Sequence, residues 1–276
     1  MNQLLTTAPN SEIIASIERN VESAFWTAAS SYPGAELIKT TELCRFLTPV
    51  MFPMGNIVVK TALKKETVDQ VVEEVLADYK QRDLPMMWFE GPNSTPKNLG
   101  AVLEAAGCTR LFESPGMAAN LAETVVGDEF PTGIRVEEVR NDALLEEWSE
   151  TLSAAFNLSQ EVVGLFTCVP KKHGFGVDAP FRLFVAYLDG IPASVSALHL
   201  AEGVAGIYCV GTRPEAQRRG LGRAISLRPM LEAKKLGYHL AVLQSSAAGL
   251  KVYERLGFQE YCRFQRYAFN LSATKS

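Results

Sequence analysis

An internal repeat is the sequence feature that most restricts how this chain can fold. When the sequence is shifted by 150 residues, two runs of helix, glycine and strand coincide, and six pairs of residues are identical. The elements before each run also follow one order, which is a strand, a long helix and a strand. Such self-similarity predicts two tandem copies of one fold. The identical pairs are Val102 and Val252, Glu104 and Glu254, Gly107 and Gly257, Ala118 and Ala268, Asn120 and Asn270, and Leu121 and Leu271.

Hydrophobic periodicity supplies the elements of each copy. Apolar residues at helical spacing predict helices, and alternating or β-branched apolar runs predict strands. The order indicates an α/β (α+β) fold class with a mixed sheet and helices on both faces, in two domains covering residues 1–126 and 132–276. The predicted helices are 11–31, 66–80, 98–106, 142–156, 159–170, 220–236 and 247–256. The predicted strands are 55–63, 85–89, 108–121 (interrupted at Pro115 and Gly116), 134–139, 181–188, 191–200, 204–212, 238–244 and 258–270, with a loop over 171–180.

Composition and charge exclude several classes of protein. With 276 residues, 47% apolar and 21% charged, each half can bury a core without metal ions or disulfides. The net charge of −4 argues against nucleic acid as a partner, because phosphate neutralisation requires a basic face. No apolar run approaches the roughly 18 residues of a membrane span, and the first residues show no leader pattern. We therefore expect a cytoplasmic protein without a membrane partner.

The cysteines indicate free thiols. They are odd in number and far apart, and neither a CxxC pair nor a cluster with metal-ligand spacing occurs. We therefore expect no metal site. The five are Cys44, Cys108, Cys168, Cys209 and Cys262.

The segment from Thr212 to Ala224 has the properties of an anion-binding turn. A strand ends near Thr212, and Gly220 and Gly222 begin a helix. Glycines remove side chains from the turn, and the first N–H groups of a helix have no intrahelical partner and carry partial positive charge. Together they suit a pyrophosphate. Three arginines, Arg218, Arg219 and Arg223, add positive charge in an otherwise acidic chain.

Alone, this pattern is equally consistent with a glycine-rich helix start whose arginines are solvated. The GxxxxGK[ST] motif is absent, and a dinucleotide fingerprint requires three spaced glycines and a later acidic residue. The segment therefore needs a second, independent motif before it indicates a ligand.

That second motif lies downstream, and the two together resemble the GNAT superfamily of N-acetyltransferases. The family's cofactor motif, Gln/Arg-x-x-Gly-x-Gly/Ala after a strand, is matched by Gln217-Arg218-Arg219-Gly220-Leu221-Gly222. Its later helix ending, Tyr-Glu-x-Leu-Gly-Phe, is matched by Tyr253 to Phe258. The resemblance is close over residues 132–271 and covers the N-terminal half only in outline. It implies two tandem GNAT-like domains, each a mixed, mostly antiparallel twisted sheet flanked by helices.

The resemblance also implies roles for individual residues. Tyr253 would protonate the departing thiolate of coenzyme A, a role that suits a phenol whose pKa lies near 10. The strand from Val204 would diverge from the strand after Tyr238, and the thioester of acetyl-CoA would lie in that gap. Backbone groups of Val210, Gly211 and Thr212 would face the acetyl-pantetheine arm. The coenzyme would be bound further by Gln217, Arg218, Arg219, Gly220, Leu221, Gly222 and Arg223, whose amides would hold the pyrophosphate.

The residue that deprotonates the acceptor amine stays open. Many family members carry a glutamate on the strand before the cofactor motif, and the corresponding residue here is Gly206, which has no side chain. Tyr208 lies on the same face of the strand. His199 and Glu202 border the hairpin before it and are further candidates, directly or through water.

The N-terminal half lacks these features. At the shift of 150 residues Leu103 replaces Tyr253, and the cofactor hexapeptide falls on residues 67–72, which contain neither glycine nor arginine. We expect this half to be degenerate and to bind no coenzyme, with a structural or substrate-shaping role. A cleft of its own around Trp88 and Glu90 is an alternative, although Trp88 also fits a core position.

These patterns predict an N-acetyltransferase that transfers an acetyl or other short acyl group from acetyl-CoA to a primary amine by direct attack in a ternary complex. Cys209 is not expected to act as a nucleophile, because strand alternation would turn it away from the acceptor side. The alternative is a non-catalytic acyl-CoA-binding sensor, and a longer-chain acyltransferase is a third possibility. The acceptor, a small-molecule or peptide amine, and the oligomeric state are not defined by the sequence.

Overall fold

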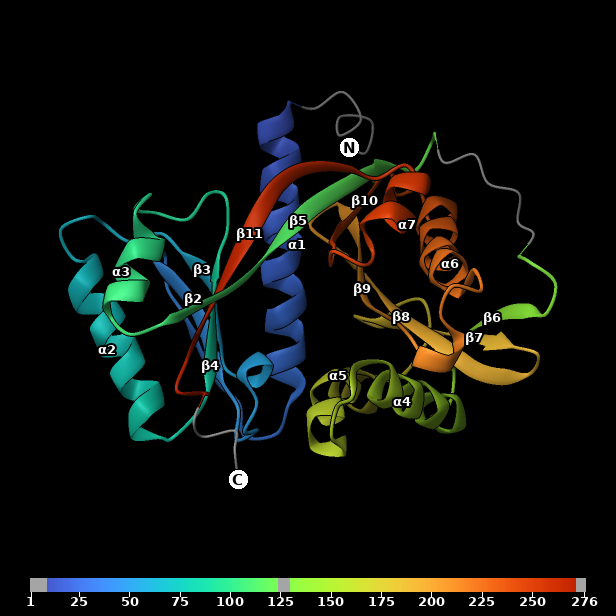
Figure 1. Cartoon of the computed structure of the whole chain (residues 1–276), viewed down its shortest axis with the longest axis horizontal. Coiled ribbons are helices and arrows are strands. Elements are labelled where there is room, and N and C mark those ends of the chain that lie inside the picture. The colour runs from blue at the N-terminus through green and yellow to red at the C-terminus, as the bar shows by residue number, and fades with distance from the viewer. Residues whose placement is uncertain (1–8, 124–129, 272–276) are drawn as a thin grey trace. The chain divides into compact units, whose positions relative to one another are not determined.

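The computed structural model describes residues 9–123 and 130–271, which form two compact units (Figure 1). We call Val21–Ser114 with Cys262–Ser276 the N-terminal unit, and Met1–Asn20 with Pro115–Tyr261 the C-terminal unit. The first helix, α1 (Asn10–Ser31), contributes to both. Each unit is α+β, as predicted, with a mixed and mostly antiparallel sheet.

The N-terminal unit has one parallel strand pair among antiparallel ones. Strand β1 pairs antiparallel with β2 and β2 with β3, whereas β3 and β4 are parallel, and β4 pairs antiparallel with the last part of β11. Helices α2 and α3 pack with these strands in one apolar core. The elements are β1 (Glu36–Lys39), β2 (Leu43–Leu47), the 3-10 turn η1 (Pro53–Gly55), β3 (Ile57–Thr61), α2 (Val68–Gln81), β4 (Met86–Glu90), α3 (Leu99–Ala105) and the first part of β5 (Thr109–Asn120).

The C-terminal unit repeats this plan. Strands β6, β7, β8 and β9 are antiparallel neighbours, β9 and β10 are parallel, and β10 pairs antiparallel with the end of β5. Helices α4 and α5 pack on one face of these strands, and α6 and α7 cover the other (Figure 1). The elements are β6 (Ile134–Glu138), α4 (Asp142–Phe156), α5 (Gln160–His173), β7 (Arg182–Leu188), β8 (Ile191–Ala201), β9 (Val204–Thr212), the 3-10 turn η2 (Pro214–Ala216), α6 (Leu221–Lys235), β10 (Leu240–Gln244), α7 (Leu250–Arg255) and β11 (Gln259–Phe269).

The last strand of each sequence half completes the sheet of the other unit. Residues Gly116–Asn120 of β5 pair with β10, and residues Gln265–Phe269 of β11 pair with β4. The predicted interruption at Pro115 and Gly116 is therefore wrong as a strand break. It marks the point at which the continuous strand β5 passes from one compact unit to the other. The division at residues 126 and 132 stays a prediction about the two sequence copies.

The repeat is visible in the geometry of two helix ends. Gly107 and Gly257, which are 150 residues apart, have φ of +93° and +91°, a backbone conformation that favours glycine. After each glycine the chain bonds back in the same way, from Cys108 N to Leu103 O and from Phe258 N to Tyr253 O. The shared motif of helix, glycine and strand is thus the same local structure in both halves.

Two further features of the structure differ from what periodicity predicts. The hairpin of β1 and β2 was not predicted, because β1 is short and largely exposed and so shows no clear apolar alternation. Residues Lys171–His173, predicted as part of a loop, belong to the last turn of α5. The cationic side chains there suit the negative end of the helix dipole.

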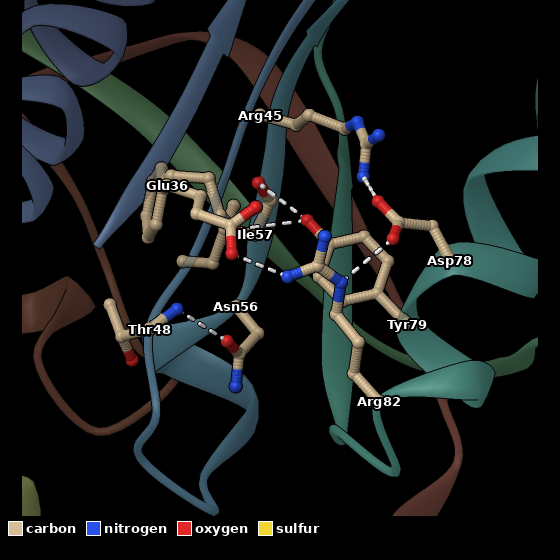
Figure 2. A network of polar contacts seen from close by, with 9 residues as sticks. Glu36, Arg45, Thr48, Asn56, Ile57, Asp78, Tyr79 and Arg82 are labelled. Atoms are coloured by element: carbon tan, nitrogen blue, oxygen red, sulfur yellow. Dashed lines mark hydrogen bonds and ion pairs between the residues drawn. The ribbon is translucent and has the colours of Figure 1, made fainter. Parts of the chain in front are cut away.

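A polar network joins α2 to the strands of the N-terminal unit (Figure 2). Asp78 accepts hydrogen bonds from Arg45 at 2.7 Å and from Arg82 at 2.8 Å, and Arg82 also pairs with Glu36. Tyr79 lies beneath this network with no solvent exposure, and its hydroxyl donates to the carbonyl of Phe46 at 2.9 Å. The buried hydroxyl fixes α2 against β2.

We expect Tyr79→Phe to lower the free energy of unfolding by about 1–2 kcal/mol, because it leaves a buried carbonyl without its donor. Urea unfolding followed by circular dichroism measures the change. Tyr261→Phe, at a partly exposed position, is the matched control and should be close to neutral. Equal effects of the two variants would contradict a specific role for the Tyr79 hydroxyl.

Candidate functional site

Strands β9 and β10 of the C-terminal unit separate after a short parallel pairing. Only Ala205 with Ala241 and Gly206 with Val242 are paired between them, whereas β9 continues to Thr212 and stays bonded to β8. In an antiparallel ladder, alternate residues direct their N–H and C=O groups away from the partner strand. Part of the backbone between Ile207 and Thr212 therefore faces a gap in the sheet. This gap lies where the sequence predicted the thioester.

A β-bulge lies on β9 beside the gap. The register between β8 and β9 shifts opposite Ser196, and Cys209 has φ of +53°, which is unusual for a residue with a side chain. As a result, Tyr208 and Cys209 both pack against the core beneath α4 and α5, whereas Val210 packs on the opposite face. The expectation that Cys209 alternates with Tyr208 is therefore wrong, because the bulge breaks the alternation.

Burial makes Cys209 an unreactive thiol. It raises the pKa of Cys209 to about 12, so the thiolate, the nucleophilic form, is scarce at neutral pH. Although Cys209 shares a face with Tyr208, its protonated thiol gives no support to a covalent enzyme intermediate.

The predicted cofactor turn has an open, uncapped helix start. Gly220 precedes α6 with φ of +90°, and no side chain caps the helix. A Cβ added at Gly222 would meet nothing within 4 Å. Helical N–H groups without an intrahelical partner, next to open space, fit the pyrophosphate of an acyl-CoA.

The backbone that leads into the turn is held by β8. The Ser194 hydroxyl donates to the Gly211 carbonyl at 2.6 Å and lies 2.8 Å from the Thr212 hydroxyl oxygen. The side chain of Gln217 returns a weak hydrogen bond to the Thr212 carbonyl at 3.4 Å. These contacts fix the conformation of the segment that the sequence assigned to the acyl arm.

The arginines of the turn are exposed charges. Arg219 lies 3.4 Å from Asp189, and both side chains are more than half exposed, so this pair contributes little to stability. Arg218 adopts the left-handed conformation with φ of +61°, and Arg223 lies in the first turn of α6. Their side chains remain available to an anion at the helix start.

Two polar groups near the gap were missed by the sequence reasoning. Among the described residues, Gln244 Nε2 at the end of β10 and Arg213 Nε at the end of β9 are buried without a hydrogen-bond partner. Thr151, Arg182 and Arg228 carry further buried polar atoms of this kind elsewhere. Such a donor requires a partner, either water or a ligand, that the protein atoms do not supply. No local pattern marks them, since only the three-dimensional fold buries these atoms.

Tyr253 lies in a protected position on α7. It is 7% exposed, and its ring packs edge-on against Phe258 at 5.8 Å. A Cβ at Gly249 would overlap that ring, so glycine at the helix start makes room for it. Burial raises the pKa of Tyr253 to about 12, although a hydrogen bond with Ser226 acts in the opposite direction. The phenol therefore holds its proton at neutral pH, as a general acid requires.

The position expected for a catalytic glutamate is filled by another residue. A Cβ at Gly206 would overlap Asn20 Oδ1 of α1 and the ring of Tyr208. Asn20 is fully buried, donates to the Ala201 carbonyl at 3.0 Å, and accepts from the Tyr208 hydroxyl at 2.7 Å. No side chain larger than hydrogen fits at residue 206 while Asn20 holds this place.

The other candidate bases lie around the same hairpin. His199 is directly opposite Gly206, is 3% exposed, and stacks on Phe181 at 4.5 Å. Burial lowers the pKa of His199, and its Nδ1 lies 2.8 Å from the Pro180 carbonyl, so a neutral ring donates from Nδ1. Glu202 lies in the turn, about half exposed, and is 3.8 Å from Arg19.

The N-terminal unit closes the equivalent gap with its own chain. Strands β3 and β4 are also parallel over only two residue pairs, but the segment after β4 returns to β3. Thr95 bonds there through Thr95 N to Thr61 O at 3.2 Å and through Leu63 N to Thr95 O at 3.1 Å. In the C-terminal unit the segment after β10 instead bonds to β5, from Ser245 N to Pro115 O.

Two of the N-terminal equivalents of the cofactor turn are core residues. Val68 and Val72 of α2 are buried, and Trp88 has no exposure and donates from Nε1 to Thr61 Oγ1 at 2.9 Å. Glu90 accepts from the Tyr267 hydroxyl at 3.0 Å. These contacts favour a core role for Trp88, and the absence of coenzyme from this unit stays a prediction.

Two copies of one plan, with an open gap in the second, are the arrangement that the GNAT resemblance implies. In agreement, the acetyltransferase (GNAT) domain family matches residues 179–260. Two solved structures share the whole arrangement, namely a GCN5-related N-acetyltransferase from Kribbella flavida (TM-score 0.70, 18% identity, 91% of this chain and 94% of that one) and a tandem GNAT protein from the clavulanic acid biosynthesis pathway (TM-score 0.59, 12% identity, 94% and 95%). Residues 179–260 thus carry a GNAT acetyltransferase domain, and the chain as a whole has the fold of a tandem GNAT protein.

Curated relatives share a narrower name. The mycothiol acetyltransferase of Rhodococcus erythropolis is 31% identical over 197 residues, covering 66% of this chain and 64% of that protein. The mycothiol acetyltransferase of Streptomyces scabiei is 41% identical over 182 residues, covering 63% of this chain and 58% of that protein. The matches thus span less than two thirds of the length of these relatives.

Residues 9–123 and 130–271 show neither a membrane span nor a metal-binding cluster. None of the helices in these ranges is long and apolar enough to cross a membrane. The same ranges hold no group of three or more histidine, cysteine or carboxylate side chains arranged to bind a metal ion.

We expect Gly220→Glu to abolish acetyl-CoA binding, because it places a carboxylate at the start of α6 where the anion is predicted. Isothermal titration calorimetry should show one acetyl-CoA bound to each wild-type chain and none to the variant. Gly237→Glu is the matched control, since Gly237 follows the other end of α6 with φ of +85° and open space around it. Both variants carry the same left-handed strain of about 1–2 kcal/mol. Equal loss of binding in both, or two sites per wild-type chain, would contradict the assignment.

Proposed function

We propose that this protein transfers an acetyl group from acetyl-CoA to an amine of a small molecule. The observation that carries the proposal is the gap between β9 and β10, which only two residue pairs join. The uncapped start of α6 follows β9 along the chain, and Tyr253 of α7 keeps its proton at neutral pH. A donor bound there would place its pyrophosphate at the helix and its thioester in the gap. Gln244 and Arg213 add buried donors that such a ligand would satisfy.

The chemistry assigned to the chain's residues is simple. The amine nitrogen attacks the thioester carbonyl, forming the C–N bond, and the C–S bond breaks as the adduct collapses. Backbone N–H groups along the free edge of β9 would stabilise the developing oxyanion. Tyr253 would give its proton to the departing sulfur and recover one from the nitrogen that has become positively charged. No covalent enzyme intermediate is required.

The acceptor class is proposed from the relatives. Proteins named mycothiol acetyltransferase share 31% and 41% identity with this chain in the matched parts. We propose that the acceptor is an amine of the mycothiol type, with desacetylated mycothiol as the first one to test. An acyl-CoA sensor is the second candidate, and the absence of a carboxylate at Gly206 favours it.

An amine panel separates the enzyme from the sensor. The protein is incubated with acetyl-CoA and desacetylated mycothiol, glucosamine, alaninamide or Nα-acetyl-lysinamide, and acetylated product and CoA are quantified by chromatography, because thiol reagents would also react with a thiol acceptor. We expect desacetylated mycothiol to be the best acceptor. Acetyl-CoA binding without turnover of any amine would favour the sensor.

Tyr253→Phe tests the general acid. We expect kcat to fall by roughly 100-fold, because proton transfer to the leaving thiolate is lost, while the Kd of acetyl-CoA changes little. Stopped turnover assays and calorimetry give the two quantities. Tyr238→Phe, at a partly buried tyrosine of the same unit, is the control and should retain activity. Unchanged kcat in Tyr253→Phe would remove this role.

A further inference from the structure

The contacts around Gly206 bear on how the acceptor amine loses its proton. We propose that none of the described residues of this protein deprotonates the ammonium form of the acceptor, that the protein takes up its acceptor as the free amine, and that it therefore selects weakly basic amines such as α-amines and amino sugars over lysine-type amines. The proposal rests on the acetyl transfer proposed above and names the class of acceptor.

The space for a carboxylate is closed at the centre of the site. Asn20 Oδ1 lies where a Cβ at Gly206 would project. The Asn20 amide is itself engaged on both sides, since its nitrogen donates to the Ala201 carbonyl and its oxygen accepts from the Tyr208 hydroxyl. A neutral amide has no basic nitrogen, so Asn20 fills the site of a base without acting as one.

The neighbouring ionisable groups on β9 are held protonated. The Tyr208 hydroxyl directs its proton to Asn20, and burial raises the pKa of Tyr208 far above its usual range. Burial likewise raises the pKa of Cys209 to about 12. Neither group can accept a proton from an ammonium ion at neutral pH. The end of α4 that packs on this strand presents Ala155 and Phe156, which do not titrate.

The remaining charged groups come from β8, the following turn and α1. His199 is buried, and burial lowers its pKa. Glu202 and Arg19 form a loose pair at about half exposure, and Arg19 also binds Glu12 at 2.7 Å. Of the described groups around Gly206, His199 is thus the remaining candidate for a general base.

Amine basicity then decides which acceptors react. An α-amine with pKa near 7.7–8.0 is roughly one third neutral at pH 7.5, whereas a lysine side chain with pKa near 10.4 is only about 0.1% neutral. Without an enzyme base, this difference enters kcat/KM, and the greater nucleophilicity of the more basic amine offsets part of it. The weakly basic amine therefore has an advantage at neutral pH before any contact with the rest of the acceptor.

The test compares pH profiles of two probes, alaninamide and Nα-acetyl-lysinamide. We expect kcat/KM to rise tenfold per pH unit and to level off near the amine pKa of each probe, about pH 8 and about pH 10. One shared inflection for both probes would indicate an enzyme base such as His199 and would overturn the proposal. His199→Gln should leave each inflection in place. A shift or loss of the inflection in His199→Gln would also overturn it.

The two proposals fail differently. If no amine is acetylated although acetyl-CoA binds, acetyl transfer itself is refuted. If Nα-acetyl-lysinamide is acetylated as fast as alaninamide at pH 7.5, transfer stands and the inferred acceptor class falls. If other amines of the panel react but neither probe does, the inferred class is overturned as well.

A stability cycle tests the steric part independently of activity. Gly206→Ala should lower Tm, and Asn20→Gly should restore part of that loss in the double variant, because it vacates the space that the new Cβ needs. Additive changes in Tm would show that Asn20 does not occupy the place of a side chain at residue 206.

Discussion

The candidate site depends on how little of β9 is paired with β10. Two residue pairs join these parallel strands, and β9 then continues for six residues bonded only to β8. Backbone N–H and C=O groups on the free edge of a strand must find partners elsewhere, in water or in a ligand. The bulge at Cys209 and the uncapped start of α6 follow along the same stretch of chain. Unpaired backbone groups are thus concentrated where the proposed acyl-CoA would need them.

The N-terminal unit shows that this opening is a property of one loop and not of the fold. Its strands β3 and β4 also separate after two parallel residue pairs. The segment after β4 nevertheless returns to β3, where Thr95 bonds to both Thr61 and Leu63. In the C-terminal unit the corresponding segment bonds to Pro115 of β5. One supersecondary plan therefore gives a closed sheet or an open one, according to which strand receives the segment after the second parallel strand. In the closed unit, the positions equivalent to the cofactor motif lie on α2 and carry buried valines where the C-terminal unit has an exposed turn with glycines.

What the sequence could predict follows from how local each determinant is. The turn at Gly220 and the helix ends at Gly107 and Gly257 were predicted because a positive φ restricts the residue type directly. The helices were predicted because their apolar faces follow a regular period. The β1–β2 hairpin was not, since an exposed strand shows no such period. The bulge at Cys209 was not, because it is set by the register with β8 and has no glycine to mark it.

Gly206 shows how a distant contact decides the meaning of a residue. In the sequence it reads only as a missing acid, although a glycine inside a strand also signals the close approach of another chain segment. The approaching segment is α1, whose Asn20 lies within the C-terminal unit together with the end of β5. Both come from the first 120 residues of the chain. The unit that carries the candidate site is therefore built from both sequence halves, and a fragment of residues 132–276 would lack the strand beside β10 and the amide that fills the site. Residues from the first sequence half are thus part of the candidate site.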